Sequence, residues 1–215
     1  MVDAREKLRA AKPEDKMAVF AVLMRLREIC CDPRLIADNW TGGSAKLDAC
    51  IELVTSAVEG GHRILLFSQF TSMLELLAKR LDEAGVSHFT LQGSTPKPVR
   101  AEQVRRFNQG EADVFLISLR AGGTGLNLTA ADIVIHYDPW WNVAAQNQAT
   151  DRAYRIGQRN PVQVYRLIAQ DTIEEKIVEL QQAKQSLADT VTGGADGAIL
   201  SMNPEQLLQL LGEEA

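Results

Sequence analysis

The fold is indicated most directly by Val114-Phe-Leu-Ile-Ser118, which runs into Leu119-Arg-Ala-Gly-Gly-Thr-Gly125 and is followed by Ile133-Val-Ile-His-Tyr137. Both apolar runs are short and unbroken, which is typical of strands buried on both faces of a parallel sheet. The glycines between them allow backbone N–H groups to approach an anion closely. Because ligands gather at the carboxyl ends of such strands, this segment is a candidate binding loop.

Strands and helices alternate on either side of this stretch. Hydrophobic periodicity predicts strands at 63–68, 87–91, 112–118, 132–136 and 162–168. It predicts helices at 14–31, 71–84, 97–108, 143–155 and 171–191, and one from Ser44, as N-cap, to about residue 58. This alternation indicates an α/β fold with a mostly parallel sheet and helices on both faces.

Three polar side chains downstream share a helical spacing. Gln148, Arg152 and Arg155 stand at i, i+4 and i+7, so a helix would place them on one face. The arginine fork matches phosphate oxygens, and an arginine finger at a transferring γ-phosphoryl group contributes roughly 10³ to 10⁵ in rate. A solvated helix face, with Asp151 paired to a neighbouring arginine, is the structural alternative.

These segments carry a family resemblance. SLRAGGTGLNLTAADIVIHYDPWWN (118–142) and QATDRAYRIGQ (148–158) resemble motifs V and VI of the Swi/Snf-type ATPases, the double-stranded DNA translocases of helicase superfamily 2. Earlier matches stand in family order at 26–33, 44–47, 65–70 and 91–96. The resemblance covers nearly the whole chain and implies a RecA-like second helicase lobe.

The resemblance also implies a domain organisation. We expect a helical appendage over 1–43 that connects to an absent first lobe, and a RecA-like C-terminal helicase lobe over 44–170. A brace helix would follow over 171–192, and a linker with a short C-terminal helix over 193–215. The chain is expected to be a fragment of a longer protein.

Two elements needed for ATP hydrolysis in this family are missing from the sequence. No Gly-x-x-x-x-Gly-Lys-Ser/Thr motif is present, and Asp82-Glu-Ala-Gly85 closes a helical pattern instead of a buried strand. We therefore expect ATP with Mg²⁺ to be bound mainly by the absent first lobe. The isolated chain is predicted to bind ATP weakly and to hydrolyse none.

Site residues follow from the resemblance, position by position. The residues implied near the nucleotide are Gly125, Asn127, Gln148, Arg152 and Arg155, of which Gln148, Arg152 and Arg155 would be catalytic. Those implied near DNA are Gln69, Ser94, Thr95, Lys97, Arg100, Ser118, Arg120, Gly123 and Thr124.

Several of these residues also have structural interpretations. Ser94 and Thr95 fit an N-cap for the 97–108 helix about as well as a DNA-backbone contact. Lys97 and Arg100 fit a solvated basic face. The glycines at 122–125 also fit a tight turn, an interpretation that we favour less than contact with a phosphate. They do not fit a Rossmann dinucleotide-binding loop, because the third glycine and the following helix are absent.

The remaining features concern packing and departures from the family. Trp140 and Trp141 are expected to pack rather than to stack on bases, and Phe67 and Phe70 to lie in the core. The apolar stripe of the brace helix is expected to pack partly against the missing partner; it comprises Ile173, Ile177, Leu180 and Leu187. Tyr154 stands where the family usually has His, Val143 where Pro is common, and Gln146-Asn147 where an acid is frequent.

Composition limits the classes of function. The formal net charge of −5 alone argues against nucleic acid, but local patches decide such binding. Lys97, Arg100, Arg105 and Arg106 form one candidate patch, and Arg120, Arg152, Arg155 and Arg159 another. Cys30, Cys31 and Cys50 are expected to be thiols rather than disulfides or metal ligands, and we expect no metal site.

Three functional classes follow. The preferred class is half of an ATP-dependent duplex-DNA translocase, with double-stranded DNA and the N-terminal RecA-like lobe of the same protein as partners and no membrane. The alternatives are a non-catalytic DNA-binding module and a protein-interaction module. The expected location is the cytoplasm, associated with the nucleoid, in a bacterium, or the nucleus in a eukaryote; the sequence does not indicate the oligomeric state or what is remodelled.

Overall fold

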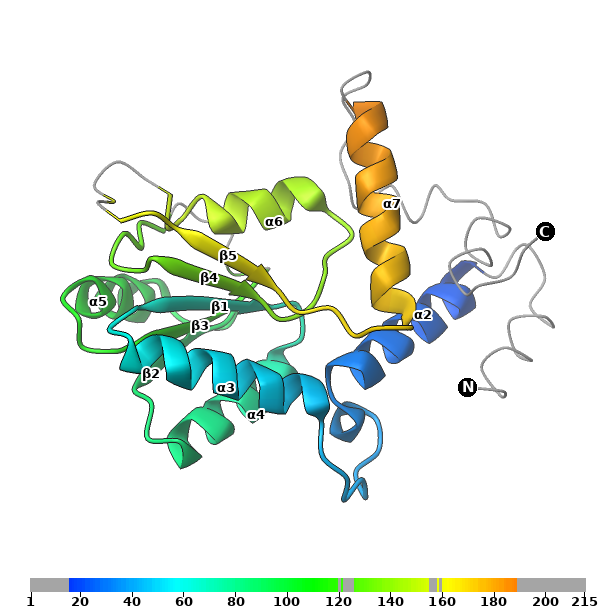
Figure 1. Cartoon of the computed structure of the whole chain (residues 1–215), viewed down its shortest axis with the longest axis horizontal. Helices are drawn as coiled ribbons and strands as arrows, with labels where there is room; N and C mark the ends of the chain where they lie inside the picture. Colours follow the sequence, from blue (N-terminus) through cyan, green and yellow to red (C-terminus); the bar gives the residue numbers. More distant parts are fainter. Residues whose placement is uncertain (1–15, 120, 122–125, 155–157, 159, 189–215) are drawn as a thin grey trace. The chain divides into compact units, whose positions relative to one another are not determined.

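The computed structural model describes residues 16–119, 121, 126–154, 158 and 160–188 of the 215 (Figure 1). The chain divides into two compact units. One, the sheet unit, comprises residues 41–140 and 144–168. The other, the helical unit, comprises residues 1–40, 141–143 and 169–215.

The sheet unit is built on five parallel strands. These are β1 (Ile64–Ser68), β2 (His88–Leu91), β3 (Val114–Ser118), β4 (Ile133–His136) and β5 (Gln163–Arg166), in the order β2-β3-β1-β4-β5. All four strand pairs are parallel. Every residue of β1, β3 and β4 is buried, which accounts for the apolar run that makes up each strand before its polar last residue. The predicted α/β fold is confirmed.

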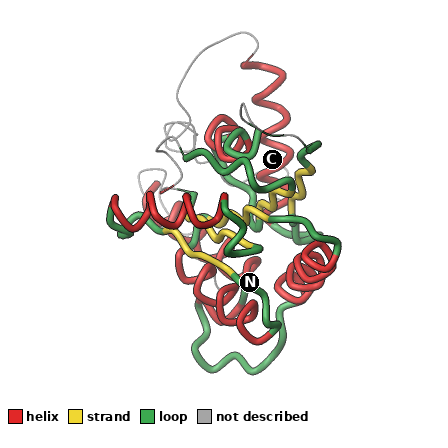
Figure 2. Tube along the Cα trace, turned by 90° about the vertical axis from the view of Figure 1, so that its left-hand side faces the viewer, coloured by secondary structure: helices red, strands yellow, loops and turns green. Residues whose placement is uncertain are grey.

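Helices cover both faces of this sheet. In Figure 1, α3 (Ala45–Glu59) and α4 (Thr71–Glu83) lie on one side of the sheet and α6 (Val143–Thr150) lies on the other. Figure 2, a view turned by 90°, also shows helices on both sides of the strands. Phe107 of α5 (Lys97–Asn108) joins Phe115 of β3 and Ala149 of α6 in one hydrophobic cluster. The helices α5 and α6 therefore share a face.

Local sequence signals account for most element boundaries. Ser44 Oγ accepts a hydrogen bond from Leu47 N and caps α3, as predicted. Phe67 is fully buried and Phe70 is 7% exposed, so both lie in the core as expected. The helix predicted at 143–155 is wrong at its end, because α6 stops at Thr150.

The helical unit has its own small core. It contains α2 (Lys16–Cys31), a short 3-10 helix (Pro33–Leu35) and α7 (Ile173–Ala188). Leu23 of α2 packs with Ile173 and Ile177 of α7, and Trp141 packs against this cluster. The guanidinium of Arg27 lies 5.4 Å from the centre of a Trp141 ring, within cation–π range. Trp141 packs as predicted; the side chain of Leu187 lies outside the described part.

The helix α7 begins two residues later than predicted. Asp171 has a φ of 56°, a left-handed conformation that Asp tolerates better than most residues. Thr172 Oγ1 then accepts a hydrogen bond from Glu174 N and donates one to the Ala169 carbonyl. The turn before α7 is therefore held by side-chain hydrogen bonds.

Cys30, Cys31 and Cys50 form no disulfide; Cys31 and Cys50 are buried and Cys30 is partly buried. Burial raises the pKa of Cys50 to about 12, so this thiol stays protonated and unreactive. Within the described residues, no helix combines the length and the apolar character needed to span a bilayer.

Candidate functional site

The carboxyl edge of the parallel sheet brings the predicted binding segments together. Ser68, the last residue of β1, is in register with Ser118, the last residue of β3. Leu119 N then donates a hydrogen bond to the Ser68 carbonyl. Since β2 pairs with β3 on its other side, the loops after β2, β3 and β1 follow one another along this edge.

A buried carboxylate joins the ends of β1 and β4. Asp138, which is 1% exposed, accepts a 2.6 Å hydrogen bond on Oδ1 from Ser68 Oγ. Gln69 N lies 3.1 Å from Oδ1 and 3.3 Å from Oδ2 of the same carboxylate. Sequence reasoning assigned no role to Asp138; the available signal was an acid two residues after a short, mostly apolar strand.

The loop after β2 does not cap the next helix. Thr95 Oγ1 accepts a hydrogen bond from Gln92 N within the loop, and Ser94 is exposed. Pro96 is the N-cap residue of α5 and makes no side-chain capping bond. The N-cap interpretation of Ser94 and Thr95 is therefore wrong, because Thr95 uses its hydroxyl to close the loop.

The basic residues of α5 fall into two groups. Lys97 is exposed and Arg100 Nη1 lies 3.4 Å from the Ala121 carbonyl, beside the loop after β3. Further along α5, Arg105 pairs with Glu102 at 2.6 Å and Arg106 with Glu111 at 2.7 Å. The hydrogen bond from Arg105 lowers the pKa of the Glu102 carboxyl. The predicted four-residue basic patch is thus reduced, because acids neutralise two of its members.

Part of the segment after β3 lies outside the described residues, namely Arg120, Gly122, Gly123, Thr124 and Gly125. Ser118 is 2% exposed. Its Oγ accepts a 3.4 Å hydrogen bond from Ala121 N. Asn127 is exposed, and its carbonyl accepts a 2.8 Å hydrogen bond from Asn108 Nδ2 of α5. The Asn127 side chain therefore remains accessible while its backbone is fixed.

The predicted polar stripe of Gln148 and Arg152 is not formed. Gln148 is exposed on α6, but Arg152 lies beyond the helix end and is only 2% exposed. Arg152 N bonds the Ala149 carbonyl three residues back, which is a tightening turn rather than a continued α-helix. Arg155 lies outside the described residues. Tyr154, at the position where the family usually has His, is 65% exposed.

The turn after α6 is tied to the segment that precedes β4. Leu128 N donates to the Arg152 carbonyl at 3.2 Å. Gln158 Nε2 donates to the Ala131 carbonyl at 2.6 Å and lies 3.3 Å from the Ala153 carbonyl. These bonds keep the regions that resemble motifs V and VI side by side.

Gln146 and Trp140 link the start of α6 to the chain after β4. Gln146 is 3% exposed, and its Oε1 lies 3.3 Å from Trp140 N, from which it accepts a hydrogen bond. Trp140 is partly buried against the main hydrophobic cluster, so it packs as predicted.

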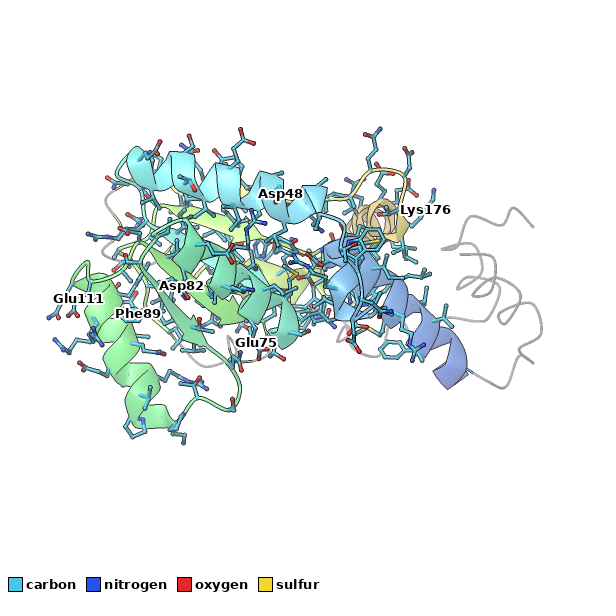
Figure 3. All side chains as sticks on the ribbon, turned by 90° about the horizontal axis from the view of Figure 1, so that it is seen from below. Asp48, Glu75, Asp82, Phe89, Glu111 and Lys176 are labelled. Atoms are coloured by element: carbon cyan, nitrogen blue, oxygen red, sulfur yellow. The ribbon has the colours of Figure 1, made fainter. Side chains whose placement is uncertain are left out.

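Acidic side chains are exposed on α3 and α4, and one of them, Asp48, pairs with Arg80 at 2.9 Å. Figure 3 labels Asp48 on α3 and Glu75 and Asp82 on α4, and all three are exposed. Asp82 belongs to a helix, so it is not the acidic strand end of an ATPase, as predicted. No group of three His, Cys, Asp or Glu side chains in the described ranges could hold a metal ion.

The parallel five-stranded sheet with helices on both faces defines an α/β domain in which the carboxyl edge of the sheet is the expected binding side. Residues 45–157 match the family model described as helicase conserved C-terminal domain. The chain belongs to this family, and its Swi/Snf character is confirmed by the relatives below.

Relatives come from bacteria, animals and archaea. The chain is 37% identical over 206 residues to an uncharacterized ATP-dependent helicase of Mycoplasma pneumoniae, covering 95% of this chain and 20% of that protein. It is 40% identical over 190 residues to a SWI/SNF-related regulator of chromatin (subfamily A member 1) of Mus musculus, covering 82% of this chain and 18% of that protein. The chain thus spans about one fifth of these relatives.

A solved structure matches almost the whole chain. The SWI2/SNF2 ATPase core of Sulfolobus solfataricus in complex with dsDNA superposes with a TM-score of 0.78 at 28% identity. The match covers 99% of this chain and 46% of that core. The RecA-like fold of the predicted second lobe is therefore confirmed.

Proposed function

We propose that this chain is the C-terminal lobe of an ATP-dependent double-stranded DNA translocase, and that ATP hydrolysis requires an N-terminal lobe of the same protein. One observation carries the proposal: the chain matches slightly less than half of an ATPase core that was solved with dsDNA. Alone, the lobe lacks the phosphate-binding motif and hydrolyses no ATP.

DNA binding is assigned to the row of loops along the carboxyl edge. Gln69 follows β1, Ser94 and Thr95 lie in the loop after β2, and Lys97 and Arg100 lie on α5, which begins after that loop. Ser118 is the last residue of β3, and Arg120, Gly123 and Thr124 follow it in the sequence. Hydroxyl, amide, cationic and backbone N–H groups are the donors that bind DNA phosphates without reading sequence.

Nucleotide binding is assigned to Gly125, Asn127, Gln148, Arg152 and Arg155. ATP with Mg²⁺, held mainly by the first lobe, supplies the phosphoryl group and its neutralising cation. The arginines of this lobe stabilise the charge that develops on the transferring group. Arg152 is buried here, so its guanidinium reaches a phosphate only if the turn after α6 opens when the lobes close. Arg155 is the first candidate for direct contact.

The test joins this chain to its upstream lobe and measures ATP turnover with and without duplex DNA, beside an Arg155→Ala variant. We expect DNA to stimulate turnover and Arg155→Ala to abolish it. A folded protein that binds DNA without turnover would favour the non-catalytic DNA-binding module, and one without salt-dependent DNA affinity would favour the protein-interaction module. The proposed location is the nucleoid in a bacterium and the nucleus in a eukaryote.

A further inference from the structure

The Asp138 carboxylate organises the backbone directly after β1. Its Oδ1 accepts the 2.6 Å hydrogen bond from Ser68 Oγ, and both of its oxygens lie within 3.3 Å of Gln69 N. Phe70 N in turn donates to Ser68 Oγ at 3.2 Å. Burial of a carboxylate is costly unless it is hydrogen-bonded, and bonds to a charged acceptor are the stronger ones. The arrangement therefore fixes three consecutive residues, 68–70.

Gln69 is the one member of this group whose side chain is not buried. Ser68 is fully buried and Phe70 is 7% exposed, while Gln69 is half-buried. Its backbone N–H is bound by Asp138, so its side chain leaves the sheet from a fixed position. No side-chain cap stabilises the start of α4 after Phe70, so Asp138 and Ser68 supply the local order there.

The opposite end of the same strand pair has a comparable carboxylate. Asp132 Oδ1, just before β4, accepts a 3.2 Å hydrogen bond from Arg63 N, just before β1. Its Oδ2 lies 2.9 Å from His62 Nδ1. Both carboxylates join β1 to β4, but Asp132 lies at the amino edge, away from the predicted DNA loops. It is a matched control for any effect that comes only from holding the strands together.

We propose that Asp138 is a positioning residue for DNA binding, which acts by holding the backbone of Gln69 so that its amide contacts the DNA backbone. The inference rests on the proposed function, in which Gln69 binds DNA. Asp138 is 1% exposed, so in this proposal it acts through Gln69 and makes no DNA contact of its own.

The experiment uses the two-lobe protein and measures the duplex concentration that half-saturates ATP turnover, together with turnover at saturating DNA. Gln69→Ala removes the amide but keeps the backbone N–H that Asp138 binds. Asp138→Ala removes the acceptor, and Asp138→Asn keeps an oxygen at Oδ1. Asp132→Ala is the control.

We expect Gln69→Ala and Asp138→Ala each to raise the half-saturating DNA concentration about tenfold, the equivalent of one hydrogen bond. The double variant is expected to have a half-saturating DNA concentration no higher than that of the more affected single variant, because both changes remove the same contact. Asp138→Asn is expected to stay within about twofold of the wild type, since one acceptor serves both donors. Asp132→Ala is expected to lower thermal stability and leave the half-saturating concentration unchanged.

Independent effects of Gln69→Ala and Asp138→Ala, which multiply in the double variant, would overturn the inference. So would an unchanged half-saturating concentration in either single variant while wild-type turnover responds to DNA. Wild-type ATP turnover that does not change when duplex DNA is added would overturn the proposed function and this inference together.

A second variant covers the case in which Asp138→Ala does not fold. Ser68→Ala removes the hydroxyl that joins Asp138 to the N–H of Phe70. It is expected to weaken DNA binding in the wild-type background and to have no effect in the Gln69→Ala background. Equal effects in both backgrounds would show that the serine acts only on general stability, against the proposal.

Discussion

The imidazole Nε2 of His136 lies 2.9 Å from the Thr150 hydroxyl and connects the end of β4 to the last residue of α6. The hydroxyl also lies 3.3 Å from the Gln146 carbonyl, to which it can only donate. Nε2 therefore carries the hydrogen that the Thr150 oxygen accepts. His136 is 1% exposed and stacks on Phe67, with ring centres 5.6 Å apart.

Removal of the Thr150 hydroxyl tests this connection. Thr150→Val keeps the shape of the side chain but leaves the buried Nε2–H without its acceptor. We expect the free energy of unfolding to fall by about 1–3 kcal/mol in urea denaturation. Thr150→Ser, which retains the hydroxyl, is expected to lose less than half as much. Equal losses in the two variants would assign the effect to packing instead.

The titration of His136 predicts a pH dependence of stability. Burial, with a smaller contribution from Arg166, lowers its pKa from 6.5 to about 4. The unfolded state therefore takes up a proton first as the pH falls. We expect the titration of this histidine to lower the free energy of unfolding by up to about 3 kcal/mol as the pH falls from 6.5 to 4. Below pH 4 it should cause no further decrease. Urea midpoints of wild type and His136→Gln should converge as the pH falls; curves that stay parallel would contradict the prediction.

The two arginines after α6 should differ in their effects. In the two-lobe protein, Arg155→Ala is expected to reduce DNA-stimulated turnover at least about 10³-fold, the lower range for an arginine finger. Arg155→Lys should restore little of the turnover lost in Arg155→Ala, because an ammonium group cannot form the bidentate contact of a guanidinium. Arg152→Ala is expected to reduce turnover and also to lower Tm, because its side chain is buried. Steady-state ATPase assays and thermal melts separate these effects; turnover near the wild-type level in Arg155→Ala would exclude the finger role.

The basic residues of α5 provide an internally controlled test of the DNA surface. Lys97→Ala and Arg100→Ala are each expected to reduce the slope of log affinity against log salt by about 0.9, the effect of one phosphate contact. Arg105→Ala and Arg106→Ala should leave the slope unchanged, because Glu102 and Glu111 already hold these side chains. Fluorescence anisotropy with a labelled duplex at several salt concentrations measures all four. An equal reduction of the salt slope in all four variants would show that the whole of α5 contacts DNA.

Local patterns were sufficient for the fold and for most element boundaries. The strands β1, β3 and β4 were predictable because a strand buried on both faces is largely apolar, and each of these has a continuous apolar run before its polar last residue. The cap at Ser44 was predictable because its hydrogen bond closes within three residues. Such interactions depend on neighbours in the chain, so the amino-acid sequence expresses them directly.

The arrangement of the site depended on contacts between distant residues. Helical spacing could not reveal the end of α6 at Thr150, beyond which the Arg152 carbonyl accepts a hydrogen bond from Leu128 N. It also could not reveal that Asp138 binds Ser68, 70 residues away. Asp138 and Ser68 meet only when the parallel strands β1 and β4 align their carboxyl ends, because the sheet, and not the spacing along the chain, sets which side chains share an edge.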